Sequence, residues 1–177
     1  MSQTPFSTSP LTLDREEFVA RFGGVYEHSP WIVERAYDQG LPDTVVSAEG
    51  LSEVLAGQVT DAEETKQLDL LRAHPDLAGK LAVVGELTDA SRSEQAGAGL
   101  DQCTAEEFDA FQTLNERYLK SFGFPFILAV KGYHRTDILD VFKKRVEHAP
   151  DVEFQEALKQ VHRIALLRLQ ALAQSGV

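Results

Sequence analysis

The stretch DVEFQEALKQVHRIALLRLQALAQ, residues 151–174, decides the fold because it predicts one long helix. Its apolar side chains recur at spacings of four and three residues, which places them on one helix face: Phe154, Leu158, Val161 and Ala165. Arg168 continues this stripe. Because burying an unpaired guanidinium group is very costly, we expect Arg168 to be paired, to line a cavity, or to reach water from the end of the stripe. Arg163 lies off the stripe and is expected to be solvated or paired with an acidic neighbour.

Similar signals along the rest of the chain predict further helices. Asp14–Glu17 and Thr104–Glu107 have the spacing of capping boxes, and no segment alternates with period two over a useful length. The run FPFILAV, residues 124–130, alone looks extended, and we interpret it as a buried apolar connection. We therefore predict an all-α fold, a single compact domain of about eight to ten helices. This domain is expected to cover residues 11–174, after a flexible tail at residues 1–10.

Composition excludes several classes of protein. The 177 residues carry a net charge of −11, which argues against nucleic-acid binding because few cations would neutralise phosphates. No apolar run approaches the roughly 20 residues of a membrane span, and the N-terminus lacks the regions of a signal peptide. Cys103 is the one cysteine, so no intrachain disulfide forms. We expect a cytoplasmic protein with neither nucleic-acid nor membrane partners.

The run LLRAHPDLAGKLA, residues 70–82, contains a histidine followed by a proline. Pro75 ends the helix predicted before it and pushes His74 out of the α region, so the imidazole projects from a helix end. A short helix is expected over residues 76–84. His74 has two interpretations at this point, a stabilising contact with the helix dipole or an acid–base catalyst.

Two further segments carry polar or backbone groups that a ligand needs. In SRSEQAGAGL, residues 91–100, Ser91 and Glu94 have capping-box spacing, but the small residues after them also permit close approach of a ligand. The non-helical run at 124–130 leaves backbone amides that need partners. The histidines and the cysteine show no metal-site spacing, and no glycine-rich phosphate loop is present, so the sequence indicates neither a metal site nor a nucleotide-phosphate site.

Five elements together resemble a known family. They are YEHSPWIVERA (26–36), LLRAHPDLAGKLA (70–82), LTDASRSEQAGAGL (87–100), LNERYLKSFGFPFILAVKG (114–132) and LKQVHRIALLRL (158–169). In order and spacing they are similar to the 2-oxo-4-hydroxy-4-carboxy-5-ureidoimidazoline (OHCU) decarboxylases of urate breakdown. The similarity runs from about residue 10 to residue 172, and the ordered set is much more specific than any one element.

The resemblance implies a cofactor-free carboxy-lyase that converts OHCU to (S)-allantoin, the last step from urate to allantoin. It implies that His74 is the general acid/base, that Glu94 is also catalytic, and that Arg168 orients the substrate and stabilises charge. The implied substrate-binding residues are Pro75, Ser91, Arg92, Ser93, Glu94, Gln95, Phe126, Ile127, Leu128, Ala129, Val130 and Arg168. Whether Arg163 or Arg168 faces the pocket stays open at this stage.

The resemblance also implies a homodimer that works with a separate 5-hydroxyisourate hydrolase and a urate oxidase. Some relatives carry a fused transthyretin-like hydrolase domain or a peroxisomal signal, and the absence of both favours a stand-alone bacterial-type cytoplasmic enzyme. Two alternatives remain. A helical binding module would tolerate loss of His74 and Glu94, and a ureido or hydantoin hydrolase would release no CO2.

Overall fold

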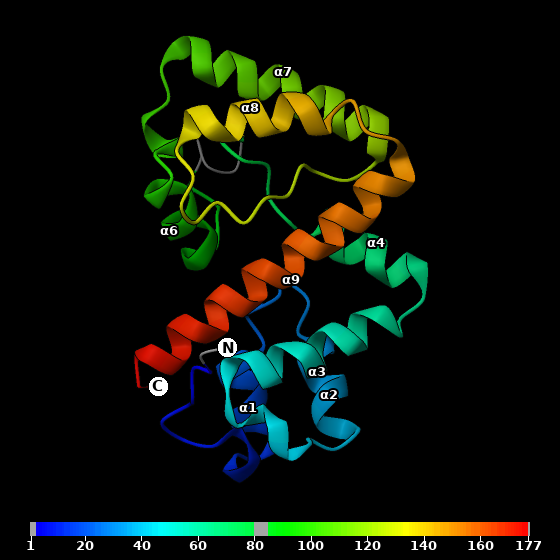
Figure 1. Cartoon of the computed structure of the whole chain (residues 1–177), viewed down its shortest axis with the longest axis vertical. Helices are drawn as coiled ribbons and strands as arrows, with labels where there is room; N and C mark the ends of the chain where they lie inside the picture. Colours follow the sequence, from blue (N-terminus) through cyan, green and yellow to red (C-terminus); the bar gives the residue numbers. More distant parts are fainter. Residues whose placement is uncertain (1–2, 80–84, 177) are drawn as a thin grey trace. The chain divides into compact units, whose positions relative to one another are not determined.

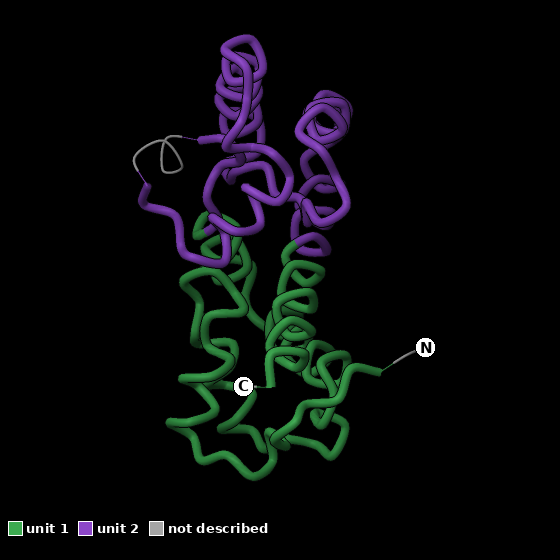
Figure 2. The backbone as a smooth tube through the Cα atoms, turned by 90° about the vertical axis from the view of Figure 1, so that its left-hand side faces the viewer, with its two compact units in different colours: residues 1–73, 161–177 green, residues 74–160 purple. Residues whose placement is uncertain are grey.

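The computed structural model describes residues 3–79 and 85–176, and its backbone divides into two compact units. Unit 1 comprises residues 1–73 and 161–177, and unit 2 comprises residues 74–160 (Figure 2). The predicted long helix is α9, Pro150–Gln174, which contributes its first part to unit 2 and its second part to unit 1. The predicted all-α fold is confirmed, because the described residues form eight α-helices and no β-strand.

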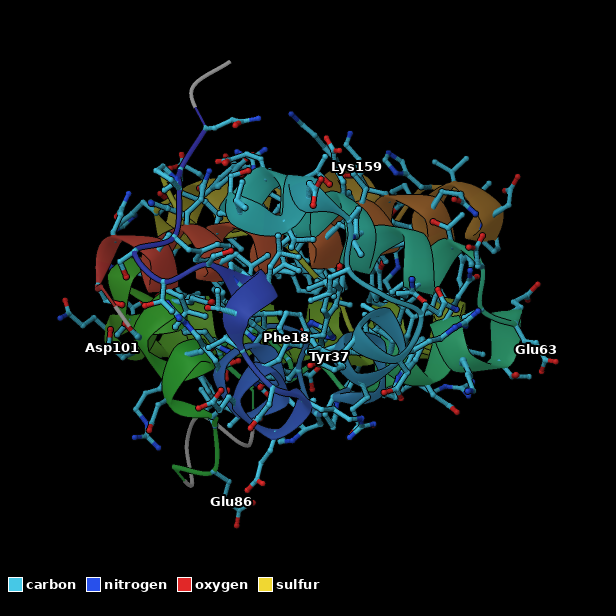
Figure 3. The ribbon with its side chains drawn as sticks, turned by 90° about the horizontal axis from the view of Figure 1, so that it is seen from below. Phe18, Tyr37, Glu63, Glu86, Asp101 and Lys159 are labelled. Atoms are coloured by element: carbon cyan, nitrogen blue, oxygen red, sulfur yellow. The ribbon has the colours of Figure 1, made fainter. Side chains whose placement is uncertain are left out.

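Unit 1 is built from short helices around an aromatic and aliphatic core. Besides the second part of α9, its elements are η1 (Pro10–Thr12), α1 (Arg15–Phe22), α2 (Trp31–Asp38), η2 (Asp43–Val46), α3 (Ala48–Thr60) and α4 (Glu64–Arg72). The predicted capping box at Asp14–Glu17 is present and starts α1. Phe18 packs on Tyr37 of α2 with ring centroids 5.3 Å apart (Figure 3).

Residues before η1 make defined contacts, although the sequence predicted a flexible tail at residues 1–10. The backbone N–H of Thr4 donates to a Glu49 carboxylate oxygen at 2.7 Å, and its hydroxyl donates to the other at 3.0 Å. Gln170 also donates to Glu49, at 2.8 Å, and Phe6 is buried. Burial raises the pKa of Glu49, but these hydrogen bonds outweigh it and lower the pKa to about 2. The segment from Thr4 onward is therefore tied to unit 1.

Unit 2 contains the segments that the sequence proposed for chemistry. Its elements are α6 (Asp89–Gly97), η3 (Leu100–Gln102), α7 (Ala105–Phe122), α8 (Arg135–Arg145) and the first part of α9. Helices α7 and α8 lie side by side (Figure 1). The predicted capping box at Thr104–Glu107 is present and starts α7.

The apolar connection at residues 124–130 is buried and non-helical, as predicted. Phe126 stacks on Phe142 of α8 with ring centroids 3.9 Å apart, and the ring of Tyr118 from α7 meets Phe126 edge-on at 5.5 Å. Aromatic pairs of this kind add stability beyond their buried area. The connection is therefore held as firmly as a core element while its backbone remains outside any helix.

Two predicted helices differ from those in the structure. Residues 76–79 form a turn rather than the start of the expected helix over 76–84, and the rest of that range lies outside the described residues. The helix expected from Ser91 begins earlier, because Thr88 is its N-cap. None of the described helices is long and apolar enough to span a bilayer.

Candidate active site

His74 lies just beyond the C-terminal end of α4, where Pro75 prevents the helix from continuing. Only 8% of His74 is exposed, and the residue has interactions within the protein. A histidine that served only to meet the helix dipole would be equally stable at the surface. Its burial therefore favours the second interpretation, a titratable group kept away from bulk water.

Three side-chain amides hold the turn that follows His74 and Pro75. Gln95 of α6 accepts from the N–H of Ala78 at 3.0 Å and donates to the carbonyl of Asp76 at 3.2 Å. Gln112 of α7 donates to the carbonyl of Ala78 at 2.8 Å, and Asn115 donates to that of Leu77 at 3.0 Å. Side chains of α6 and α7 thus form hydrogen bonds with the polar backbone groups of this turn.

The turn has an unusual backbone conformation at Ala78, where φ is +49°. A left-handed conformation is unfavourable for an alanine and persists only where surrounding contacts enforce it. Gln95 and Gln112, which bond the N–H and the carbonyl of Ala78, supply such contacts. The backbone of residues 76–78 is consequently held by side chains of α6 and α7.

Helix α6 presents a buried polar face formed by Ser91 and Gln95. Glu94 is partly buried, whereas Arg92 and Ser93 are exposed. Ser91 does not cap the helix, because its own N–H is bonded by the hydroxyl of Thr88 at 3.3 Å. The capping-box interpretation of Ser91 and Glu94 is wrong, since both lie inside the helix that Thr88 starts.

The buried connection also offers polar groups. Within the described part of the chain, no hydrogen bond reaches the backbone N–H or carbonyl of Leu128, although that residue is only 6% exposed. Buried backbone groups are nearly always paired with protein, water or ligand. The backbone groups of Phe126, which is fully buried, likewise have no hydrogen bond among the described residues, so the connection offers several backbone groups that a ligand or water could pair.

Arg168 belongs to unit 1 and forms an ion pair. Pairing was one of the three outcomes expected from its place on the apolar stripe of the last helix. It donates to a carboxylate oxygen of Glu27 at 2.9 Å, with the two side chains 9% and 2% exposed. Tyr26, which precedes Glu27 in the sequence, shares a hydrogen bond of 2.8 Å with His162. Burial lowers the pKa of His162. Arg163 is exposed, as expected. Unit 1 thus holds two polar pairs, in which Tyr26 and Glu27 are buried and His162 and Arg168 are partly buried.

A cavity of about 710 Å³ in unit 2 lies between α6, η3 and the start of α7. Of the predicted site residues, Arg92 and Gln95 line it. Among the lining residues that the structure describes, neither His74 nor Glu94 appears. Across residues 3–79 and 85–176, no cluster of histidine, cysteine, aspartate or glutamate side chains is arranged to hold a metal ion.

The sequence prediction missed two polar residues that share the signal used for Arg168. Asn115 lies between Phe111 and Tyr118 on the buried stripe of α7, at spacings of four and three. Arg145 ends the stripe of α8 that begins with Ile138 and Phe142. A polar residue on an apolar helix face must be paired or must serve a ligand, and applying that rule to every helix finds both.

The described residues form a helical protein with a buried histidine at a turn held by side-chain amides, which favours an enzyme over a scaffold. The model of the OHCU decarboxylase family matches residues 11–170. The chain belongs to that family.

Individual relatives cover nearly the whole chain. OHCU decarboxylases from Halalkalicoccus jeotgali and Haloferax volcanii are each 45% identical to it, over 90% and 89% of this chain and 86% and 89% of theirs. A crystal structure of (S)-allantoin synthase superimposes with a TM-score of 0.71 at 32% identity, covering 92% of this chain and 52% of that one. An OHCU decarboxylase crystallised with (S)-allantoin, at 21% identity and a TM-score of 0.67, shares the fold.

Proposed function

We propose that this chain decarboxylates OHCU to (S)-allantoin without a cofactor, with His74 as the general acid/base. The observation that carries the proposal is the burial of His74 at a rigid turn in a chain of this decarboxylase family. An imidazole titrates near neutral pH, and a fixed position lets it deliver a proton to one face of the substrate.

The reaction needs orientation and proton transfer rather than an added electron sink. The C–C bond to the carboxylate breaks, CO2 leaves, and the electron pair passes into the adjacent C=N group of the ring. The ring nitrogen of that group takes up a proton, the resulting enol loses its hydroxyl proton, and the neighbouring carbon gains a proton and becomes the stereocentre of allantoin. His74 transfers these protons, and a rigid site makes their delivery one-sided.

The other predicted residues orient the substrate in this proposal. Glu94 holds the imidazole or binds ureido N–H groups, and Arg168 binds an oxygen-rich edge through paired hydrogen bonds. Further contacts come from Pro75, Ser91, Arg92, Ser93, Gln95, Phe126, Ile127, Leu128, Ala129 and Val130. The unpaired backbone groups of Leu128 support the last segment of this set.

The proposal includes a homodimer that acts in the cytoplasm. A single cysteine fits a reducing compartment. The substrate is supplied by a urate oxidase followed by a 5-hydroxyisourate hydrolase. This pathway link is supported by a Bacillus subtilis relative, a bifunctional protein of uric acid degradation, which is 38% identical over 89% of this chain and 30% of its own length.

The test is to generate OHCU in situ from urate, add the protein, and follow both CO2 release and circular dichroism. The proposal predicts faster CO2 release than the spontaneous reaction and a dichroic signal of the S enantiomer. A hydrolase of the same pathway would consume substrate without releasing CO2. A binding module would change neither the rate of CO2 release nor the dichroic signal. Either of these results would refute the proposed activity.

A further inference from the structure

The backbone on both sides of Leu128 is held by side chains from two different helices of unit 2. Arg145 of α8 donates through Nη1 to the carbonyl of Ile127 at 2.6 Å. Gln160 of α9 accepts from the N–H of Ala129 at 3.0 Å through Oε1. These two anchors act on the peptide groups immediately before and after Leu128, and neither anchor belongs to the residues proposed to bind substrate.

The anchors determine where the polar groups of Leu128 point. In a trans peptide the carbonyl of one residue and the N–H of the next point in opposite directions, and no cis peptide occurs among the described residues. Because Arg145 takes the carbonyl of Ile127, the N–H of Leu128 points away from Arg145. By the same reasoning, the carbonyl of Leu128 points away from Gln160.

Arg145 is itself fixed by a buried ion pair. Its Nε and Nη2 donate to the two oxygens of Glu153 at 2.8 and 2.9 Å, and the side chains are 6% and 0% exposed. Tyr118 donates to Glu153 at 2.6 Å, and the guanidinium of Arg145 lies 4.5 Å from the ring centre of Phe126. A guanidinium with this many partners has little freedom, so it is well suited to hold a backbone carbonyl in place.

We propose that Arg145 and Gln160 are positioning residues that keep the N–H and carbonyl of Leu128 directed at the ligand. The proposal rests on the proposed function for the identity of that ligand, a ureido-substituted imidazolone with adjacent N–H and C=O groups. Glu153 and Tyr118 act one step further back by fixing Arg145. The network thus selects the donor and the acceptor that the buried connection presents.

The test compares two double variants that each replace one arginine–glutamate pair by the same neutral residues. Arg145→Met/Glu153→Gln removes the anchor on Ile127 without leaving an unpaired buried charge. Arg135→Met/Glu107→Gln is the matched control, because this pair of unit 2, 20% and 19% exposed, has no hydrogen bond to residues 126–130. Gln160→Met removes the other anchor and decides the question if the first double variant does not fold.

Two readouts separate positioning from mere stabilisation. We expect KM to rise roughly tenfold in the first double variant and in Gln160→Met, with a smaller change in kcat, because one substrate contact is misdirected. A purely structural role would lower the folded fraction, and therefore kcat, at an unchanged KM. The control is expected to keep the KM of the wild type.

Amide NMR of Leu128 provides a readout that does not depend on activity. Titration with (S)-allantoin is expected to shift this amide in the wild type and in the control, but much less in the anchor variants. Folded anchor variants with the wild-type KM and Leu128 shift would overturn the inference, as would a wild-type Leu128 amide that does not respond. Failure of wild-type decarboxylation would instead refute the proposed function, and the Leu128 shift would still decide the role of the anchors.

Discussion

The single substitution Arg145→Met gives the sharpest stability prediction, because it leaves the carboxylate of Glu153 without its guanidinium in a fully buried site. Removing one partner of a buried ion pair costs about 3–5 kcal/mol of unfolding free energy. For a chain of 177 residues this corresponds to a fall in Tm of roughly 6–20 °C. Chemical denaturation and thermal melting at pH 7 measure both quantities.

The same substitution predicts a characteristic pH dependence. In the wild type, burial raises the pKa of Glu153 but hydrogen bonds from Arg145 and Tyr118 outweigh it, so the folded pKa is lowered. The ion pair therefore stabilises the folded protein at pH values above the unfolded pKa of Glu153, about 4.3. This stabilisation is lost as the pH falls toward the folded pKa. In Arg145→Met only Tyr118 and His148 remain to oppose burial, so we expect burial to prevail and the folded pKa of Glu153 to lie above the unfolded one.

The variant consequently loses stability as pH rises through the unfolded pKa, while the wild type gains it. The difference in unfolding free energy should widen from about pH 4 to pH 7. Arg145→Met/Glu153→Gln lacks the buried charge and should recover much of the loss at pH 7. Equal stability of Arg145→Met and wild type at pH 7, or a difference that does not vary with pH, would refute this reasoning.

Two further predictions concern the other anchored segments. Gln95→Met removes both bonds of that side chain to the turn after His74, so we expect a loss of kcat at nearly full folding, measured by steady-state kinetics beside circular dichroism; unchanged kcat would show that the turn needs no support from α6. The second prediction concerns Glu49, whose pKa is lowered to about 2. Its carboxylate stabilises the folded protein at pH values above its unfolded pKa, and this stabilisation is lost as the pH falls toward the folded pKa. Glu49→Gln should therefore cost ~1 kcal/mol at neutral pH after allowance for solvent screening and should unfold with a flatter pH dependence below about pH 5. Parallel pH profiles of variant and wild type would contradict the link to Glu49.

Local signals in the sequence were sufficient to predict most of the helices and the buried connection, but not the turn at residues 76–79. Capping boxes at Asp14 and Thr104 start helices where their spacing predicted, because an N-cap acts within one turn. Ser91 shows the limit of this reasoning. Its spacing to Glu94 fits a capping box, but Thr88 competes for the same role three residues earlier and prevails.

Contacts between distant residues were beyond prediction from one sequence. Gln112 and Asn115 lie more than thirty positions from the turn that they hold, and nothing in local spacing connects them to Ala78 or Leu77. The positive φ of Ala78 is likewise a product of these contacts, since the local sequence favours an ordinary conformation for alanine. Pairing across the fold, rather than propensity, sets these features.

The most direct test of the central claim is the stereochemical assay repeated with His74→Asn, which keeps a polar side chain of smaller size at the buried position. The variant is expected to retain the helical circular dichroism of the wild type. It should fail to accelerate CO2 release from OHCU generated in situ, so that the allantoin formed is racemic. A folded His74→Asn protein that still produces (S)-allantoin at the wild-type rate would contradict the assignment of His74 as the acid–base catalyst.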